Sequence, residues 1–259
     1  MESIESIQLL DAILDLHHRP VGVRFLYTEQ EYDALDVPAC SEKLNYCQMV
    51  RLAGQGKGIK AKKEDFRCQS GARAFGLMDI PESVRSGEGL FKMGLYPDLM
   101  QQRMVYSRMA ECMQKIAGLQ VAPLEQYTDV PPHVVVLVTT PYNVMRFVQG
   151  YAYQYGGYRG GQCFGNRAIC CEATAHPFVT QDLNITPLCS GTRYHCGWAS
   201  EEMALGIPYE KWIPTVNGIL QTLNATEPLE NKKWIAARLE RLGIDFAVDR
   251  KKSYYCTWN

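Results

Sequence analysis

The residues of this 259-residue chain that could do chemistry are its ten cysteines. Two stretches repeat one order, in which a cysteine stands before a Ser-Gly pair and an arginine: "CQSGAR" at 68–73 and "CSGTR" at 189–193. The N-terminal segment "MESIESIQLLDAILDL" has the apolar spacing of an amphipathic helix and no features of an export signal, so we expect a cytoplasmic protein. A reducing compartment keeps thiols free, which favours metal binding, catalysis or redox work over disulfides.

Three kinds of thiol chemistry fit a cysteine-rich chain. Structural zinc is disfavoured, because no C-x2-C pair occurs in the sequence. A cysteine nucleophile needs a base, for which His133, His176 and His195 are candidates. An iron-sulfur cluster needs four thiolates, and separate loops can supply them when the fold brings them together. The nucleophile and the cluster both stay open at this point. Three cysteines without a glycine-rich or polar neighbourhood are expected to pack as small apolar side chains: Cys40, Cys112 and Cys256.

The small residues of the repeated stretches fit the surroundings of a bound cofactor. Gly71 and Gly191 let the backbone approach closely, and backbone N–H groups in such turns can donate to sulfur. Arg73 and Arg193 could offset the negative charge of thiolates. We therefore predict that these four residues contact a cofactor.

A second binding feature is the tyrosine and glycine stretch "YAYQYGGYRGGQ" at 151–162. Its aromatic rings and Arg159 could line a pocket for a flat or anionic small molecule. This feature supports an alternative to a metalloprotein, a non-enzymatic binding module for a small ligand or cofactor.

The composition narrows the class of partner. Hydrophobic residues make up 46% and charged residues 21% of the chain, and the formal net charge is -1. These values are typical of a globular protein and give no basic surface for nucleic acid. The longest apolar run, "VVVLV" at 134–138, is too short to span a membrane. A small-molecule substrate or a redox partner protein is therefore the expected partner, and a homo-oligomer is compatible with the sequence.

The order of predicted elements repeats along the chain. Each half reads as a strand (21–27 and 133–139), a helix (41–54 and 141–155), a glycine-marked connection, and a cysteine followed by small residues. Further helices are predicted over 98–117 and in three segments from about Ser200 to Gly243. We expect an α+β fold in one globular domain, 1–259, with a pseudo-duplicated strand-helix core, related halves at 20–118 and 131–208, and C-terminal helices that cover the core.

Four longer stretches resemble a known family: "YCQMVRLAGQGKGIKAKKEDFRCQSGARAFGL", "PHVVVLVTTPYNVMRFVQGYAY", "CCEATAHP" and "PLCSGTRYHCGWASEEMALGIP". Together they are similar to domain-of-unknown-function family 169, a bacterial and archaeal group. The resemblance implies that Cys47, Cys68, Cys171 and Cys189 recur, with Cys170 as an alternative to its neighbour. Four thiols suit a [4Fe–4S] cluster, which implies electron transfer or a reductive or Lewis-acid reaction on a small molecule in an anaerobe.

Overall fold

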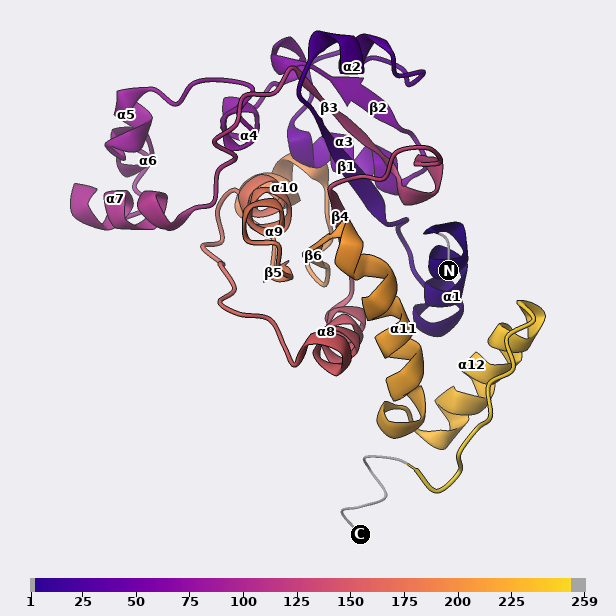
Figure 1. The fold of residues 1–259 in the computed structure, drawn as a ribbon. Coiled ribbons are helices and arrows are strands. Elements are labelled where there is room, and N and C mark those ends of the chain that lie inside the picture. The colour runs from indigo at the N-terminus through magenta and orange to yellow at the C-terminus, as the bar shows by residue number, and fades with distance from the viewer. Residues whose placement is uncertain (1–2, 253–259) are drawn as a thin grey trace.

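A six-stranded antiparallel sheet forms the centre of the protein, with the strand order β2-β3-β1-β4-β6-β5. The structure, a computed structural model, describes residues 3–252. Helices lie on both faces of the sheet (Figure 1), so the α+β prediction is confirmed. The strands are β1 (Val21–Leu26), β2 (Ile59–Ala61), β3 (Gly118–Pro123), β4 (Val134–Thr139), β5 (Asn184–Thr186) and β6 (Met203–Pro208).

The two halves of the sheet repeat one register. In β1–β3 the first residue, Val21, lies opposite the last, Pro123, and in β4–β6 Val134 lies opposite Pro208 in the same way. Each short edge strand then pairs antiparallel with its neighbour, its first residue opposite the fourth residue of β3 or β6. Three strands of each half therefore have the same order, direction and alignment.

The halves meet where β1 pairs antiparallel with β4. Gly22 lies opposite Val135 at the centre of this short ladder, with one further pair on each side. Exchanging the halves maps the central pair onto itself and the flanking pairs onto each other. A local two-fold axis thus passes between Gly22 and Val135.

Two helical layers cover the sheet, and β4 is buried on both faces. Its residues Val134, Val136 and Val138 belong to one core, and Val135 and Leu137 belong to the other. This alternation is the two-residue period of a strand, and it explains why the whole strand is apolar. The first core includes side chains of α3 (Tyr46–Gly54), α4 (Gln69–Ala74) and a π-helix (Ala168–Ala175), and the second those of α1 (Ser3–Leu14), α8 (Pro141–Tyr155), α11 (Tyr209–Thr226) and α12 (Leu229–Arg241).

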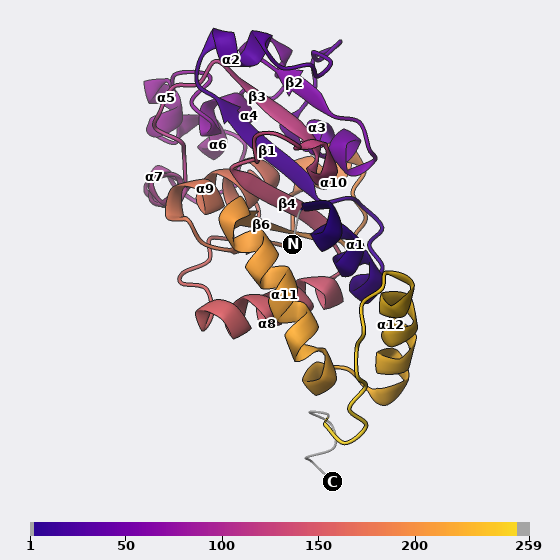
Figure 2. The same cartoon turned by 45° about the vertical axis from the view of Figure 1, so that its right-hand side comes forward.

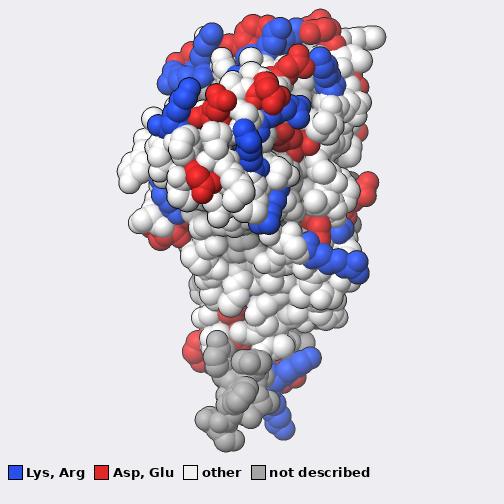
Figure 3. Space-filling view, turned by 90° about the vertical axis from the view of Figure 1, so that its left-hand side faces the viewer, with Lys and Arg blue, Asp and Glu red and all other residues white. Residues whose placement is uncertain are grey.

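Short elements complete the chain. Figure 1 shows α5, α6 and α7 projecting from the sheet as an arm, and Figure 2 shows α12 beside α1 at the opposite end. On the face that carries the arm, charges of both signs gather over the upper part, and the middle is mostly uncharged (Figure 3). The remaining elements are α2 (Glu29–Asp33), two 3-10 turns (Lys63–Asp65 and Leu124–Gln126), α5 (Glu82–Arg85), α6 (Glu88–Phe91), α7 (Leu99–Arg108), α9 (His176–Thr180) and α10 (Ser190–Cys196).

Local signals fix several elements as predicted. Thr140 caps α8 by accepting a hydrogen bond from the Asn143 N–H, Pro141 opens the helix, and Gly156 ends it in the left-handed conformation. The strands predicted over 21–27 and 133–139 are β1 and β4. The C-terminal helices α11 and α12 cover the second core.

Three predicted helices were wrong in part, and in two of them long-range pairing decides the backbone. The segment after Ser200 forms the inner strand β6, paired along its length with β4, although Met203, Ala204 and Leu205 favour a helix locally. The helix predicted over 98–117 ends at Arg108. The helix predicted from Ser41 begins at Tyr46, because the residues before it bridge to the segment after β2.

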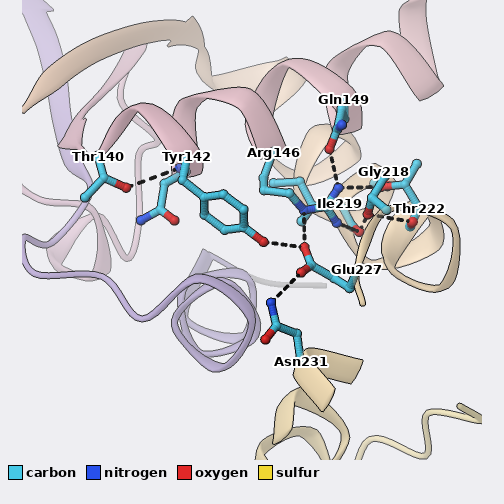
Figure 4. A network of polar contacts seen from close by, with 11 residues as sticks. Thr140, Tyr142, Arg146, Gln149, Gly218, Ile219, Thr222, Glu227 and Asn231 are labelled. Carbon is cyan, nitrogen blue, oxygen red and sulfur yellow. Dashed lines mark hydrogen bonds and ion pairs between the residues drawn. The ribbon is translucent and has the colours of Figure 1, made fainter. Parts of the chain in front are cut away.

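A buried ion pair joins the helices of the second layer. Nε of Arg146 on α8 lies 3.0 Å from Oε1 of Glu227, and both side chains are almost fully buried. Tyr142 and Asn231 donate hydrogen bonds to the same carboxylate, so α8, the end of α11 and α12 share one network (Figure 4).

Candidate functional site

The cysteines converge on a cavity of about 730 Å³ beside the first core. Its wall contains thiols from separate parts of the chain, namely those of Cys47, Cys68, Cys170, Cys189 and Cys196. Three of the four residues implied as cluster ligands thus line one cavity. The fourth, Cys171, is buried and is absent from the lining, where its neighbour Cys170 stands.

A backbone bridge brings Cys47 and Cys68 to the same place. Leu44 N–H donates to the Asp65 carbonyl (2.9 Å), and Arg67 N–H donates to the Leu44 carbonyl (2.9 Å). These bonds lay the chain that enters α3 beside the chain that enters α4. Cys47 then falls in the first turn of α3, and Cys68 is the residue before α4.

Helix α10 and the residue before it supply two thiols of the second half. Cys189 is the residue before α10, as Cys68 is before α4, and Cys196 is its last residue. The Thr192 hydroxyl lies 3.1 Å from Cys189 Sγ and 3.5 Å from Cys47 Sγ. Gln48 Nε2 donates to the His195 carbonyl at 3.5 Å, which adds a second contact between α3 and α10.

Cys170 of the π-helix reaches the site through an unusual backbone turn. Arg167 precedes the π-helix in the left-handed conformation (φ 56°), and its carbonyl accepts from Cys171 N–H (2.7 Å) and from Cys170 Sγ (3.5 Å). The Arg167 guanidinium in turn donates to the Ser70 carbonyl (3.1 Å). This contact joins the π-helix to α4. π-Helical turns are frequent at functional sites, and here the turn presents Cys170 to the cavity.

The thiols differ in acidity. A hydrogen bond to Cys196 and burial raise the pKa of Cys47. The same hydrogen bond lowers the pKa of Cys196, and the charge of Arg51 lowers it further. A hydrogen bond to Cys171 and burial raise the pKa of Cys170. Among these three thiols, Cys196 most readily becomes a thiolate.

The charges around the cavity are positive. Arg67 and Arg167 belong to the lining, and no Asp or Glu does among the described residues. Arg167 is buried, with Nη1 3.1 Å from Oε1 of Glu111. Burial alone would lower the pKa of its guanidinium, but Cys171, Cys170, Tyr106 and Glu111 together raise it.

The other predicted contacts divide into two groups. Gly71 and Gly191 line the cavity. Arg73 and Arg193 are absent from the lining: Arg73 donates to Gln69 Oε1 at 2.6 Å, and Arg193 donates to backbone carbonyls, including that of Pro187 at 2.7 Å. Both arginines therefore hold local backbone or side chains in place.

The remaining candidates lie elsewhere, with one exception. His195 lines the cavity, whereas the Nδ1 of His133 accepts from Phe25 N–H (3.0 Å) and His176 is buried beside Thr180. Besides Cys171, three described cysteines are absent from the lining: Cys40 is half-buried, Cys112 is buried and Cys163 is exposed. Cys256 lies outside the described residues.

The tyrosine stretch forms a separate cluster. Tyr151 is buried and contacts Asp182 and Lys211, with Lys211 Nζ 2.8 Å from its hydroxyl. Tyr153, Tyr155 and Tyr158 are exposed. None of these four residues lines the thiol cavity.

The sequence interpretation missed several lining residues. Arg67 and Cys196 stand directly beside a predicted ligand or base, so adjacency in the sequence was an available signal. Thr192 lies inside the "CSGTR" stretch but was not singled out, and Asn166 belongs to no motif. Leu90, Met93 and Leu95 come from the arm, which no sequence pattern connects with the cysteines.

Two features are absent from residues 3–252. No group of three or more His, Cys, Asp or Glu side chains forms a site for a metal ion. No helix is long and apolar enough to cross a bilayer.

Comparison with known proteins gives one match. Residues 9–218 match the family DUF169, described as "Uncharacterised ArCR". No curated protein and no solved structure matches the chain significantly. The match covers well over half of the sequence, so the chain belongs to the DUF169 family.

Proposed function

We propose that the thiol cavity binds a [4Fe–4S] cluster through Cys47, Cys68 and Cys189, with Cys170 rather than Cys171 as the fourth ligand. The observation that carries the proposal is the convergence of thiols from both halves of the chain on one cavity. The described part of the lining contains no Asp or Glu, which also favours an occupant that brings negative charge.

The spacing of the sulfurs bears on the type of metal centre. Ligands of one ion must crowd around a single point, and no such group occurs among the described residues. Ligands of a cubane bind four different irons and stand farther apart around a larger object. The proposal therefore rests on the shared cavity, and the number of irons per chain distinguishes a cluster from a mononuclear site.

The chain's own residues have definable roles around such a centre. The Thr192 hydroxyl is placed to donate to the sulfur of Cys189, and Arg167 provides buried positive charge beside Cys170. Gly191 leaves open space, because only Cys189 Sγ lies within 4 Å of where its side chain would begin. When bound, the cluster would supply one-electron transfer, or Lewis acidity if one iron lacks a protein ligand.

Iron and acid-labile sulfide analysis of oxygen-free protein tests the proposal, together with electron paramagnetic resonance. About four irons and four sulfides per chain are expected. Cys68→Ala should lose most of both, whereas Cys163→Ala, which removes an exposed thiol outside the cavity, should keep them. Colourless, iron-free protein after anaerobic purification and reconstitution would refute the cluster.

A cysteine nucleophile is the second candidate, favoured by the lowered pKa of Cys196. Cys47 stabilises the thiolate by a hydrogen bond, and His195 lines the same cavity. A nucleophile should react with iodoacetamide at one equivalent, at Cys196, and faster than Cys163. Equal rates at the two positions would exclude an activated Cys196.

A further inference from the structure

The thiol cavity has a second part that the cysteines do not explain. Leu90, Met93, Leu95 and Tyr96, from α6 and the segment after it, belong to the lining together with Phe164. Met93 is 72% exposed and Leu95 is 52% exposed, so this apolar wall remains open to solvent. The volume of about 730 Å³ lies within the usual range for small-molecule sites, which combine apolar walls with a few polar groups.

Two polar groups of this cavity lack partners within the described residues. The Arg67 guanidinium is exposed and forms no hydrogen bond or ion pair with the described residues, unlike that of Arg167, which pairs with Glu111. The Asn166 amide nitrogen is buried and has no acceptor. An unpaired buried donor is costly, and the cost is recovered when a ligand supplies an acceptor.

The charge of the wall selects the ligand. Because the described lining contains arginines and no carboxylate, it attracts anions and disfavours cations. Arginine binds carboxylate and phosphate groups well, since its planar guanidinium can donate two parallel hydrogen bonds.

We propose that the cavity binds a small organic anion, with its carboxylate or phosphate group at Arg67 and Asn166 and its apolar body against Met93, Leu95 and Tyr96. This ligand would be the small molecule on which the proposed cluster acts, and to that extent the inference rests on the proposed function. Its binding, however, uses residues other than the cluster ligands. The two ideas can therefore fail separately.

Titration calorimetry with four probes tests this site, in cluster-free and in cluster-loaded protein. Hexanoate and hexyl phosphate carry an anionic group and an apolar body, hexanamide lacks the charge, and acetate lacks the body. Hexanoate, hexyl phosphate or both should bind at least about ten-fold more tightly than hexanamide and acetate, which corresponds to about 1.4 kcal/mol. The anion that binds more tightly identifies the headgroup.

Variants assign the binding to the proposed residues. Arg67→Gln should lower the affinity for the tighter-binding anion about ten-fold or more, and Arg67→Lys should lower it less. Arg85→Gln, an exposed arginine on the arm but outside the lining, is the matched control and should change nothing. Asn166→Ala should weaken binding of the anion, and it should weaken binding of hexanamide no more than that.

Each outcome decides one of the two ideas. Equal affinities for hexanoate, hexyl phosphate and hexanamide, no binding of either anion at millimolar concentration, or unchanged binding by Arg67→Gln would overturn the anion site. Arg67-dependent binding to protein that takes up no iron would support the anion site and refute the cluster. Iron uptake without anion binding would do the reverse.

Discussion

Cys47 and Cys189, 142 positions apart in the sequence, both lie within hydrogen-bonding distance of one hydroxyl, that of Thr192 (3.5 and 3.1 Å). Cys47 lies on α3, in the first half of the fold, and Cys189 precedes α10, in the second half. Thr192 therefore joins the two halves of the fold at the proposed centre.

The first prediction concerns this hydroxyl. Thr192→Val keeps the shape of the side chain and removes the donor, so it should lower the free energy of unfolding by only about 1 kcal/mol. In cluster-loaded protein the reduction potential should become more negative, because a hydrogen bond to a ligand sulfur favours the reduced state. Thr215→Val, a buried threonine of the opposite layer, should leave the potential unchanged. Equal potentials in both variants would contradict a role for Thr192.

The second prediction separates the adjacent thiols of the π-helix. Cys170 lines the cavity and Cys171 does not, so Cys170→Ala should lose iron while Cys171→Ala keeps it. Both side chains are buried, so each variant loses a similar amount of packing and the comparison is matched. Iron content after reconstitution is the measurement. Loss only in Cys171→Ala would restore the ligand set implied by the family resemblance.

The sequence predicted the elements that local signals determine better than the strand that long-range pairing determines. The apolar period of β1 and β4 and the caps of α8 are local signals, and these elements were correct. β6 was mistaken for a helix because its pairing with β4 involves residues about seventy positions away. Pairing over such distances has no signature in short windows.

The candidate site shows the same division. The two motifs at Cys68 and Cys189 mark the lining directly, because in each half the cysteine precedes a helix that follows an edge strand. The arginines of the motifs were expected at the cofactor, but Arg193 donates to carbonyls on both sides of α10, those of Pro187 and Glu202. Its direction depends on these flanking segments, which the motif does not describe.

The third prediction uses the glycines of the two motifs. A Cβ added to Gly191 would meet only Cys189 Sγ, at 3.9 Å, so Gly191→Ala should leave stability unchanged or raise it by about 0.5–1 kcal/mol. A Cβ on Gly71 would lie 3.2 Å from Tyr46 Cβ, so Gly71→Ala should destabilise the protein. Thermal unfolding checks both. Lower iron content in the stable Gly191→Ala protein would indicate that the cofactor needs this open space; wild-type content would contradict it.

The fourth prediction concerns the ion pair in the second layer. Glu227→Gln leaves the buried Arg146 charge without its counter-ion, so the free energy of unfolding should fall by about 3–5 kcal/mol. Asn231→Ala removes one hydrogen bond to the same carboxylate and should cost only about 1 kcal/mol. Urea denaturation measures both values. A similar loss in the two variants would show that the ion pair adds little to the network.

The last prediction is a dependence of stability on pH. Burial lowers the pKa of both His133 and His176. Between the folded and the unfolded pKa values, the unfolded chain binds more protons, so stability is complete above about pH 6.5 and falls as the pH drops below that value. The double variant His133→Gln and His176→Gln should lose less stability between pH 7 and pH 5 than the wild type, measured by urea denaturation at each pH. Only the wild type takes up protons at these two rings when it unfolds below about pH 6.5. Equal losses of stability in the two proteins would therefore assign the pH dependence to other groups.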